Sequence, residues 1–167
     1  MAAKILYFED EPDLCALVKA KLESAGDYTV VVSMTAQGGE DIAAREMPDL
    51  ILMDVVMPGR SGWDLAKSLK KKNSPVRRTP IVIISGKGEM IFQKKTVDFK
   101  WTPNNPLAKT REQLPDVRGA EASALAYGVE DFIAKPFRLE VLVEVVQEVL
   151  KRFRKVEKEE GKDDSLI

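Results

Sequence analysis

The chain has 167 residues, 44% of them hydrophobic and 32% charged, and its 26 Lys and Arg residues nearly balance its 27 Asp and Glu residues. This length and composition are typical of one globular domain with short appendages, which buries roughly two-thirds of its unfolded surface without a disulfide or a structural metal. With one Cys and no His, the chain cannot form an intramolecular disulfide, a Cys-based zinc cluster, histidine-ligated zinc or a nucleophile paired with histidine.

Short apolar strands alternate with amphipathic helices along the chain, a pattern typical of a parallel α/β sheet with both faces covered. The five predicted strands all read as buried and cover Lys4 to Glu9, Tyr28 to Ser33, Asp49 to Asp54, Pro80 to Ser85 and Asp131 to Ala134. The five predicted helices cover Pro12 to Ala25, about Gly39 to Met47, Gly62 to Lys72, about Ala120 to Tyr127, and Leu139 to about Val156. Pro suits the first turn of the first helix, and Gly26 its end.

Two segments do not fit this alternation. The interval from Ser85 to Lys135 exceeds what a strand-to-strand crossover needs by on the order of thirty residues, and we place this insertion at about 87–118. After the last helix, helical periodicity fades and charge density rises, so we expect a charged, disordered tail over 157–167. The sequence thus predicts one domain over residues 1–156.

Acidic residues follow two of the predicted strands. Glu9 and Asp10 come at the end of the first strand, and Asp54 ends the third. Ligands of open α/β sheets bind beyond the carboxyl ends of the strands, so we expect these carboxylates to converge there. Hard oxygen donors of this kind suit Mg²⁺. The alternative is that each acid caps the helix that follows it.

Two more strands bring polar groups to the same edge. Ser85 ends the fourth strand and precedes Gly86, and Lys135 follows the fifth. A carboxylate can act as a nucleophile and form an acyl phosphate. A metal and a Lys would neutralise the transferring phosphoryl group, a hydroxyl could donate to it, and a Gly would let it approach the backbone.

Four segments resemble the receiver domain of two-component response regulators, in the right order across about residues 3–155. They are ILYFEDEPDL, DLILMDVVMPGRSGWDL, PIVIISGK and YGVEDFIAKPF. The resemblance implies a doubly wound, flavodoxin-like parallel sheet of strand order 2-1-3-4-5, with the insertion in the fourth crossover. It also implies a cis peptide bond between Lys135 and Pro136.

The same resemblance assigns roles to residues of this chain. Asp54 would be the phosphoacceptor, with Lys135 and Ser85 as the residues that assist it. Mg²⁺ or Mn²⁺ would be held by four groups, namely Glu9, Asp10, Asp54 and the backbone carbonyl of Val56. The phosphoryl group would contact Ser85, Gly86 and Lys135, and the switch would consist of Ser85 and Phe132. Glu9, Ser85 and Phe132 stand where the family more often has Asp, Thr and Tyr.

Two functions remain open at this point. The first is a receiver that takes a phosphoryl group from a partner phosphohistidine, with at most Mg²⁺-dependent self-phosphorylation and slow autodephosphorylation as its own activity. The second is a pseudo-receiver, a docking module that phosphorylation does not regulate because the insertion covers the site or locks the signalling helix. A phosphatase acting on a separate substrate is disfavoured, because Val55 and Val56 supply no second acid beside Asp54. A nucleotide-binding P-loop is disfavoured because Ile81 stands where its Gly is required.

The expected partners are a histidine kinase or histidine phosphotransfer protein and a downstream protein target. Apolar residues spaced three and four apart in the last helix also fit a homodimer contact.

A net charge of -1 gives no pull toward nucleic acid or membranes, and apolar runs such as Ile5–Phe8 are far too short for a membrane span. We therefore expect a cytoplasmic protein. No output domain follows in this sequence, so a stand-alone receiver and a fragment of a longer protein are both open.

Overall fold

A computed structural model describes residues 2–86 and 128–163, with the backbone alone for Ser85 and residues 155–163. The expected insertion at about 87–118 and the predicted helix at about 120–127 lie outside the described residues, as do residues 164–167 of the expected tail.

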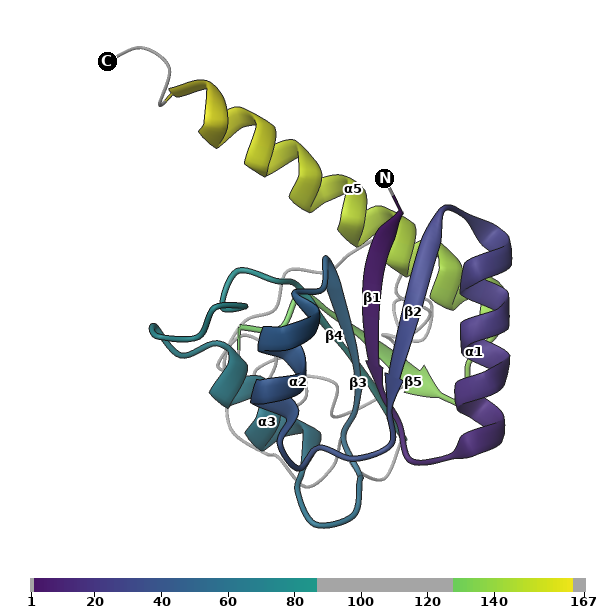
Figure 1. The fold of residues 1–167 in the computed structure, drawn as a ribbon. Helices are drawn as coiled ribbons and strands as arrows, with labels where there is room; N and C mark the ends of the chain where they lie inside the picture. The colour runs from purple at the N-terminus through teal and green to yellow at the C-terminus, as the bar shows by residue number, and fades with distance from the viewer. Residues whose placement is uncertain (1, 87–127, 164–167) are drawn as a thin grey trace, which may run out of the picture.

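A five-stranded sheet forms the centre of the molecule (Figure 1). Its strands are β1 (Ala3–Phe8), β2 (Tyr28–Ser33), β3 (Leu50–Asp54), β4 (Ile81–Gly86) and β5 (Asp131–Lys135). All pairings are parallel and the order is β2-β1-β3-β4-β5, so the predicted fold class and strand order are confirmed. Every residue of the central strand β3 is buried, as expected for a parallel strand covered on both faces.

Helices cover the two faces of the sheet in pairs (Figure 1). Helices α1 (Pro12–Ala25) and α5 (Leu139–Asp163) lie on one face, and α2 (Gly39–Glu46) and α3 (Gly62–Leu69) lie on the other. Alternate strand residues feed two separate hydrophobic clusters: Ile5 and Tyr7 pack on the α1/α5 side, and Leu6 and Phe8 on the α2/α3 side. No helix in the described part of the chain is long and apolar enough to cross a membrane.

Two helices end at different residues from those predicted. Helix α3 ends at Leu69 instead of Lys72, because the chain turns there and Lys71 donates its N–H to Ser68 O. Helix α5 continues to Asp163, past the predicted end at about Val156, and Figure 1 shows it running beyond the edge of the sheet. The part of the expected disordered tail that the structure describes, 157–163, is therefore helical. Its Glu and Lys residues have high helix propensity, which favours this continuation.

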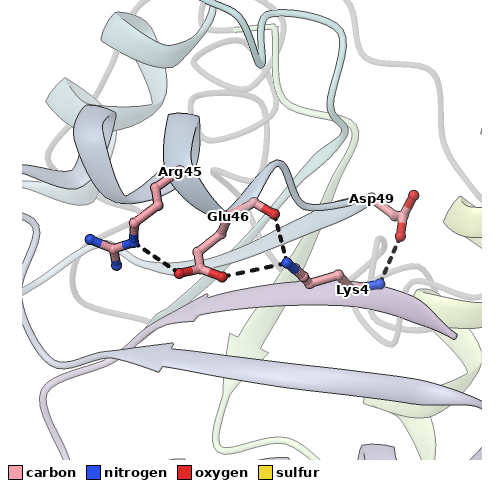
Figure 2. A network of polar contacts seen from close by, with 4 residues as sticks. All are labelled: Lys4, Arg45, Glu46 and Asp49. Carbon is pink, nitrogen blue, oxygen red and sulfur yellow. Dashed lines mark hydrogen bonds and ion pairs between the residues drawn. The ribbon is translucent and has the colours of Figure 1, made fainter.

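A polar network ties β1 to the end of α2 and the start of β3 (Figure 2). Lys4 Nζ donates to Glu46 O at 3.0 Å and lies 3.5 Å from Glu46 Oε2, while Lys4 N donates to Asp49 Oδ2 at 2.7 Å. Arg45 Nε lies 3.1 Å from Glu46 Oε1. Because Lys4 lies near the start of β1, the network holds the end of the sheet opposite to the ends where the predicted site residues lie.

Candidate functional site

The carboxyl ends of four strands meet at one edge of the sheet. Glu9 follows β1, Asp54 ends β3, Gly86 ends β4 and Lys135 ends β5. The register places these ends together, because Phe8 pairs with Met53 and Gly86 pairs with Lys135. The structure therefore brings to one edge the residues that the sequence predicts there.

Three carboxylates gather at this edge. Each of Glu9, Asp10 and Asp54 offers an oxygen atom that lies within 4.8 Å of the others. Glu9 is 1% exposed and Asp54 4% exposed, while Asp10 is the most solvent-accessible of the three. Helix capping explains little of this arrangement: Glu9 Oε1 accepts from Glu11 N at 3.2 Å, and no described side chain caps α1.

Lys135 connects two of these carboxylates. Its Nζ lies 2.7 Å from Glu9 Oε2 and 3.4 Å from Asp54 Oδ2, and its side chain is 24% exposed. Burial alone would lower the pKa of Lys135, but the hydrogen bond to Glu9 and the charges of Asp54 and Glu9 outweigh burial and raise that pKa. Lys135 is therefore a fixed cation between two anions.

Glu9 has further donors that sequence reasoning missed. Tyr7 Oη donates to Glu9 Oε2 at 3.2 Å, and Cys15 Sγ donates to the Glu9 backbone oxygen at 3.2 Å. Burial and, to a smaller extent, the charge of Glu9 raise the pKa of the Tyr7 hydroxyl. The same two causes raise the pKa of the Cys15 thiol to about 11. Both groups stay protonated near neutrality and act as donors. The spacing of Tyr7 and Glu9 was the available signal, because residues two apart on a strand share a face.

The remaining predicted residues lie near this edge in different environments. Ser85 pairs with Ala134 through the backbone, which places it one residue before the end of β4. Phe132 is 4% exposed and packs in the cluster under α2 and α3. Val56 is 56% exposed, two residues after Asp54. The Lys135-Pro136 peptide bond is cis, as the resemblance implies.

The loop between β3 and α3 (residues 55–61) passes close to Asp54. A Cβ atom on Gly62 would overlap the carbonyl oxygen of Asp54, so only glycine permits this approach of the helix start. Gly62 N also donates to Val55 O at 2.8 Å. Farther along the loop, Arg60 makes two hydrogen bonds of 2.7 Å with the Glu40 carboxylate on α2. Sequence reasoning missed both Gly62 and the Arg60–Glu40 pair.

The donor set fits a small divalent cation. Three carboxylates with oxygens within 4.8 Å, two of them buried, provide hard oxygen ligands and a concentrated negative charge. Mg²⁺ and Mn²⁺ prefer such ligands, and the absence of His from the sequence disfavours softer metals. Chemically, the edge thus combines a metal-compatible acidic cluster, a buried carboxylate on β3 and a fixed cation.

Comparison with known proteins gives a consistent match. The family model of the response regulator receiver domain matches residues 5–102 of the chain. The chain is 28% identical over 148 residues to the response regulator ArlR of Staphylococcus epidermidis, covering 89% of this chain and 52% of ArlR. It is 32% identical over 143 residues to the response regulator PleD of Caulobacter vibrioides, covering 77% of this chain and 31% of PleD. The chain thus spans about half of ArlR and about a third of PleD.

Solved structures share the same fold. The chemotaxis protein CheY4 of Vibrio cholerae aligns with a TM-score of 0.62 at 22% sequence identity, and the alignment covers 89% of this chain and 99% of that chain.

Proposed function

The chain belongs to the response regulator receiver domain family of two-component systems, and on this premise we propose that Asp54 accepts a phosphoryl group from a phosphohistidine on a partner. The partner is a histidine kinase or a histidine phosphotransfer protein. One observation carries the proposal: the Asp54 carboxylate is 4% exposed at the carboxyl end of β3, beside two further acids and 3.4 Å from the Lys135 cation.

The transfer exchanges one bond for another. An oxygen of the Asp54 carboxylate attacks phosphorus, the new O–P bond forms, and the P–N bond to the partner imidazole breaks. The imidazole leaves with the electron pair of that bond and takes up a proton, while Asp54 becomes an acyl phosphate. Because the chain contains no His, the donor histidine must belong to the partner.

Other residues at the edge stabilise the transferred group. Lys135, whose raised pKa keeps it charged, pairs with a phosphoryl oxygen. Ser85 donates its hydroxyl to another oxygen, and Gly86 leaves the backbone accessible beside it. Lys135 therefore exchanges a carboxylate partner for the phosphoryl group when Asp54 is modified.

Metal binding completes the proposed site. Glu9, Asp10, Asp54 and the backbone carbonyl of Val56 would hold Mg²⁺ or Mn²⁺, and the bound ion supplies positive charge to the transferring phosphoryl oxygens. The acidic cluster supports this assignment through its donor type and its close spacing.

Phosphorylation is proposed to change contacts with a downstream protein. Ser85 and Phe132 form the switch, and the Phe132 ring is buried in the described state, so a change of its rotamer would alter the surface next to β5. The switching unit is proposed to comprise residues 1–156, with the insertion at about 87–118. A homodimer through α5 would be one means of output.

Beryllofluoride, which mimics a phosphoryl group on a carboxylate, tests the proposal. Wild-type protein with Mg²⁺ should bind it, and fluorine NMR should show a bound signal that the Asp54→Asn variant lacks. The Asp64→Asn variant, which changes an acid at the start of α3 outside the proposed site, is the control and should bind normally. Absence of a bound signal for wild type would favour the pseudo-receiver, a docking module that phosphorylation does not regulate.

A further inference from the structure

We propose that the ion pair between Arg60 and Glu40 positions the loop that carries the Val56 carbonyl, and thereby sets the affinity of the site for Mg²⁺. This inference rests on the proposed function, because it assigns Val56 to the metal. It makes Arg60 and Glu40 positioning residues that do not touch the metal themselves.

The pair has the geometry of a clamp. Arg60 Nη1 lies 2.7 Å from Glu40 Oε2, and Arg60 Nη2 lies 2.7 Å from Glu40 Oε1. Two parallel bonds between a planar guanidinium and a planar carboxylate fix orientation as well as distance. The loop at Arg60 is therefore held in one orientation relative to α2.

Charge strengthens this contact. The hydrogen bonds from Arg60 lower the pKa of Glu40 to about 2, so the carboxylate stays ionised at every pH near neutrality. Glu40 also lies in the first turn of α2, where the helix dipole favours a negative charge. Both partners are partly exposed, with Arg60 at 24% and Glu40 at 39%, so the pair depends on geometry more than on desolvation.

The anchor on α2 is itself fixed. Gly39, which precedes Glu40, is buried, and a Cβ atom there would overlap the side chain of Leu65 on α3. The start of α2 therefore packs directly on α3. Arg60 thus ties the loop to a rigid pair of helices.

The rest of the loop explains why this clamp matters for Val56. Met57 is 7% exposed and packs in the core, which fixes the loop just after Val56. Gly59 has a left-handed backbone (φ 79°) and lies beside the side chain of Gln37. At the far end, Ser61 Oγ accepts from Trp63 N at 3.1 Å and caps α3. Arg60 lies on the exposed span 58–60 between these two fixed ends, so the clamp acts on Val56 through Met57, the next residue in the chain.

A backbone ligand differs from a side-chain ligand in one physical respect. A side chain can rotate toward a metal, whereas a carbonyl moves only with its loop, so its position must be set before binding. Loss of a group bonded directly to a metal ligand typically costs roughly 10- to 100-fold in metal affinity. Arg60 acts through the loop, so we expect a smaller loss, about three- to tenfold.

The experiment compares four variants with wild type. Glu40→Gln and Arg60→Gln each break the clamp, and the double exchange Glu40→Arg with Arg60→Glu rebuilds it with the charges reversed. Glu140→Gln is the matched control, because Glu140 forms an exposed 3.3 Å ion pair with Lys21 on the opposite face of the sheet. Mg²⁺ affinity is measured by calorimetry, and amide hydrogen exchange is measured without Mg²⁺.

Both measurements have a defined expected result. The single variants should bind Mg²⁺ about three- to tenfold more weakly, and the amides of Val56, Met57 and Arg60 should exchange faster while those of β3 do not. The charge-reversed protein should recover most of the affinity, and Glu140→Gln should match wild type.

Two other results would overturn the inference, and they are distinguishable. If wild type binds Mg²⁺ and the single variants bind it equally well, or their loop amides exchange no faster, the clamp has no positioning role and the proposed function stands. If wild type itself binds no Mg²⁺, both the proposed function and this inference fail, before any variant is compared.

Discussion

The ammonium group of Lys135 lies 2.7 Å from the Glu9 carboxylate, which is only 1% exposed. Without that cation, a buried negative charge would remain next to a second buried carboxylate, Asp54. The two side chains come from residues 126 positions apart, so the contact joins β1 to β5 across β3 and β4. The resting site is therefore held together by the same cation that is proposed to bind the phosphoryl group.

Replacing Lys135 should destabilise the protein through Glu9. Breaking a fully buried ion pair costs about 3–5 kcal/mol, and since Lys135 is 24% exposed we expect Lys135→Met to lose about 1–2 kcal/mol. The measurement is urea unfolding without Mg²⁺. Adding Glu9→Gln to Lys135→Met should recover part of the loss, because it removes the uncompensated charge. If the double variant is no more stable than Lys135→Met, then the Glu9 charge is not the cause.

Replacing Gly62 by Ala should move the backbone next to Asp54. The added Cβ atom overlaps the Asp54 carbonyl oxygen, and overpacking of this kind costs about 1–3 kcal/mol. We expect lower stability in urea and slower modification of Asp54. Gly38→Ala is the control: Gly38 has a left-handed backbone (φ 65°) but open space around it, so it should lose only about 1 kcal/mol. Equal effects on Asp54 in both variants would contradict the steric explanation.

The stability contributed by Glu40 should depend on pH in the acidic range. Arg60 lowers the pKa of Glu40 from 4.5 to about 2 in the folded protein. A depressed carboxyl pKa adds stability that is present above the unfolded value and is lost as pH falls toward the folded value. The stability difference between wild type and Glu40→Gln, about 1 kcal/mol or less for an exposed pair, should be constant from pH 7 to about 5 and shrink below about 4.5. A difference that grows on acidification would contradict this.

The exposed side chain of Val56 should influence how long the acyl phosphate on Asp54 lasts. Val56 is apolar and 56% exposed, so it cannot orient an attacking water. Val56→Asn and Val56→Glu supply a polar group at that position and should shorten the lifetime several-fold. The check is the decay of phosphorylated protein after removal of the donor, with Val56→Ala as the control for loss of bulk. Unchanged decay in the polar variants would show that water positioning does not limit hydrolysis.

Much of this arrangement could be predicted because it follows from local sequence. Short buried strands with an acid, a Ser or a Lys at their ends predict a parallel sheet with those groups at one edge, and Glu9, Asp10, Asp54 and Lys135 do lie there. The strand order came from the resemblance of whole motifs. The end of α5 at Asp163 was missed, because lost apolar periodicity was interpreted as disorder although Glu and Lys favour a helix.

The contacts that hold the site were not predictable in the same way. Arg60 and Glu40 are ordinary charged residues 20 positions apart, and only the packing of α2 on α3 brings them together. The spacing of Tyr7 and Glu9 indicates a shared face but not a contact, because the hydrogen bond from the Tyr7 hydroxyl also depends on the rotamer of Glu9. Such pairs depend on three-dimensional positions that the periodicity of individual segments does not contain.

Mass spectrometry of the intact protein after incubation with acetyl phosphate, and of its peptides after borohydride reduction to locate the acyl phosphate, tests the central claim most directly. We predict that wild type with Mg²⁺ gains one phosphoryl group, that the group maps to Asp54, and that neither the Asp54→Asn variant nor wild type without a divalent cation gains it at that position. A wild-type protein that stays unmodified with Mg²⁺, or that carries the group at another residue while Asp54 is intact, would contradict the account.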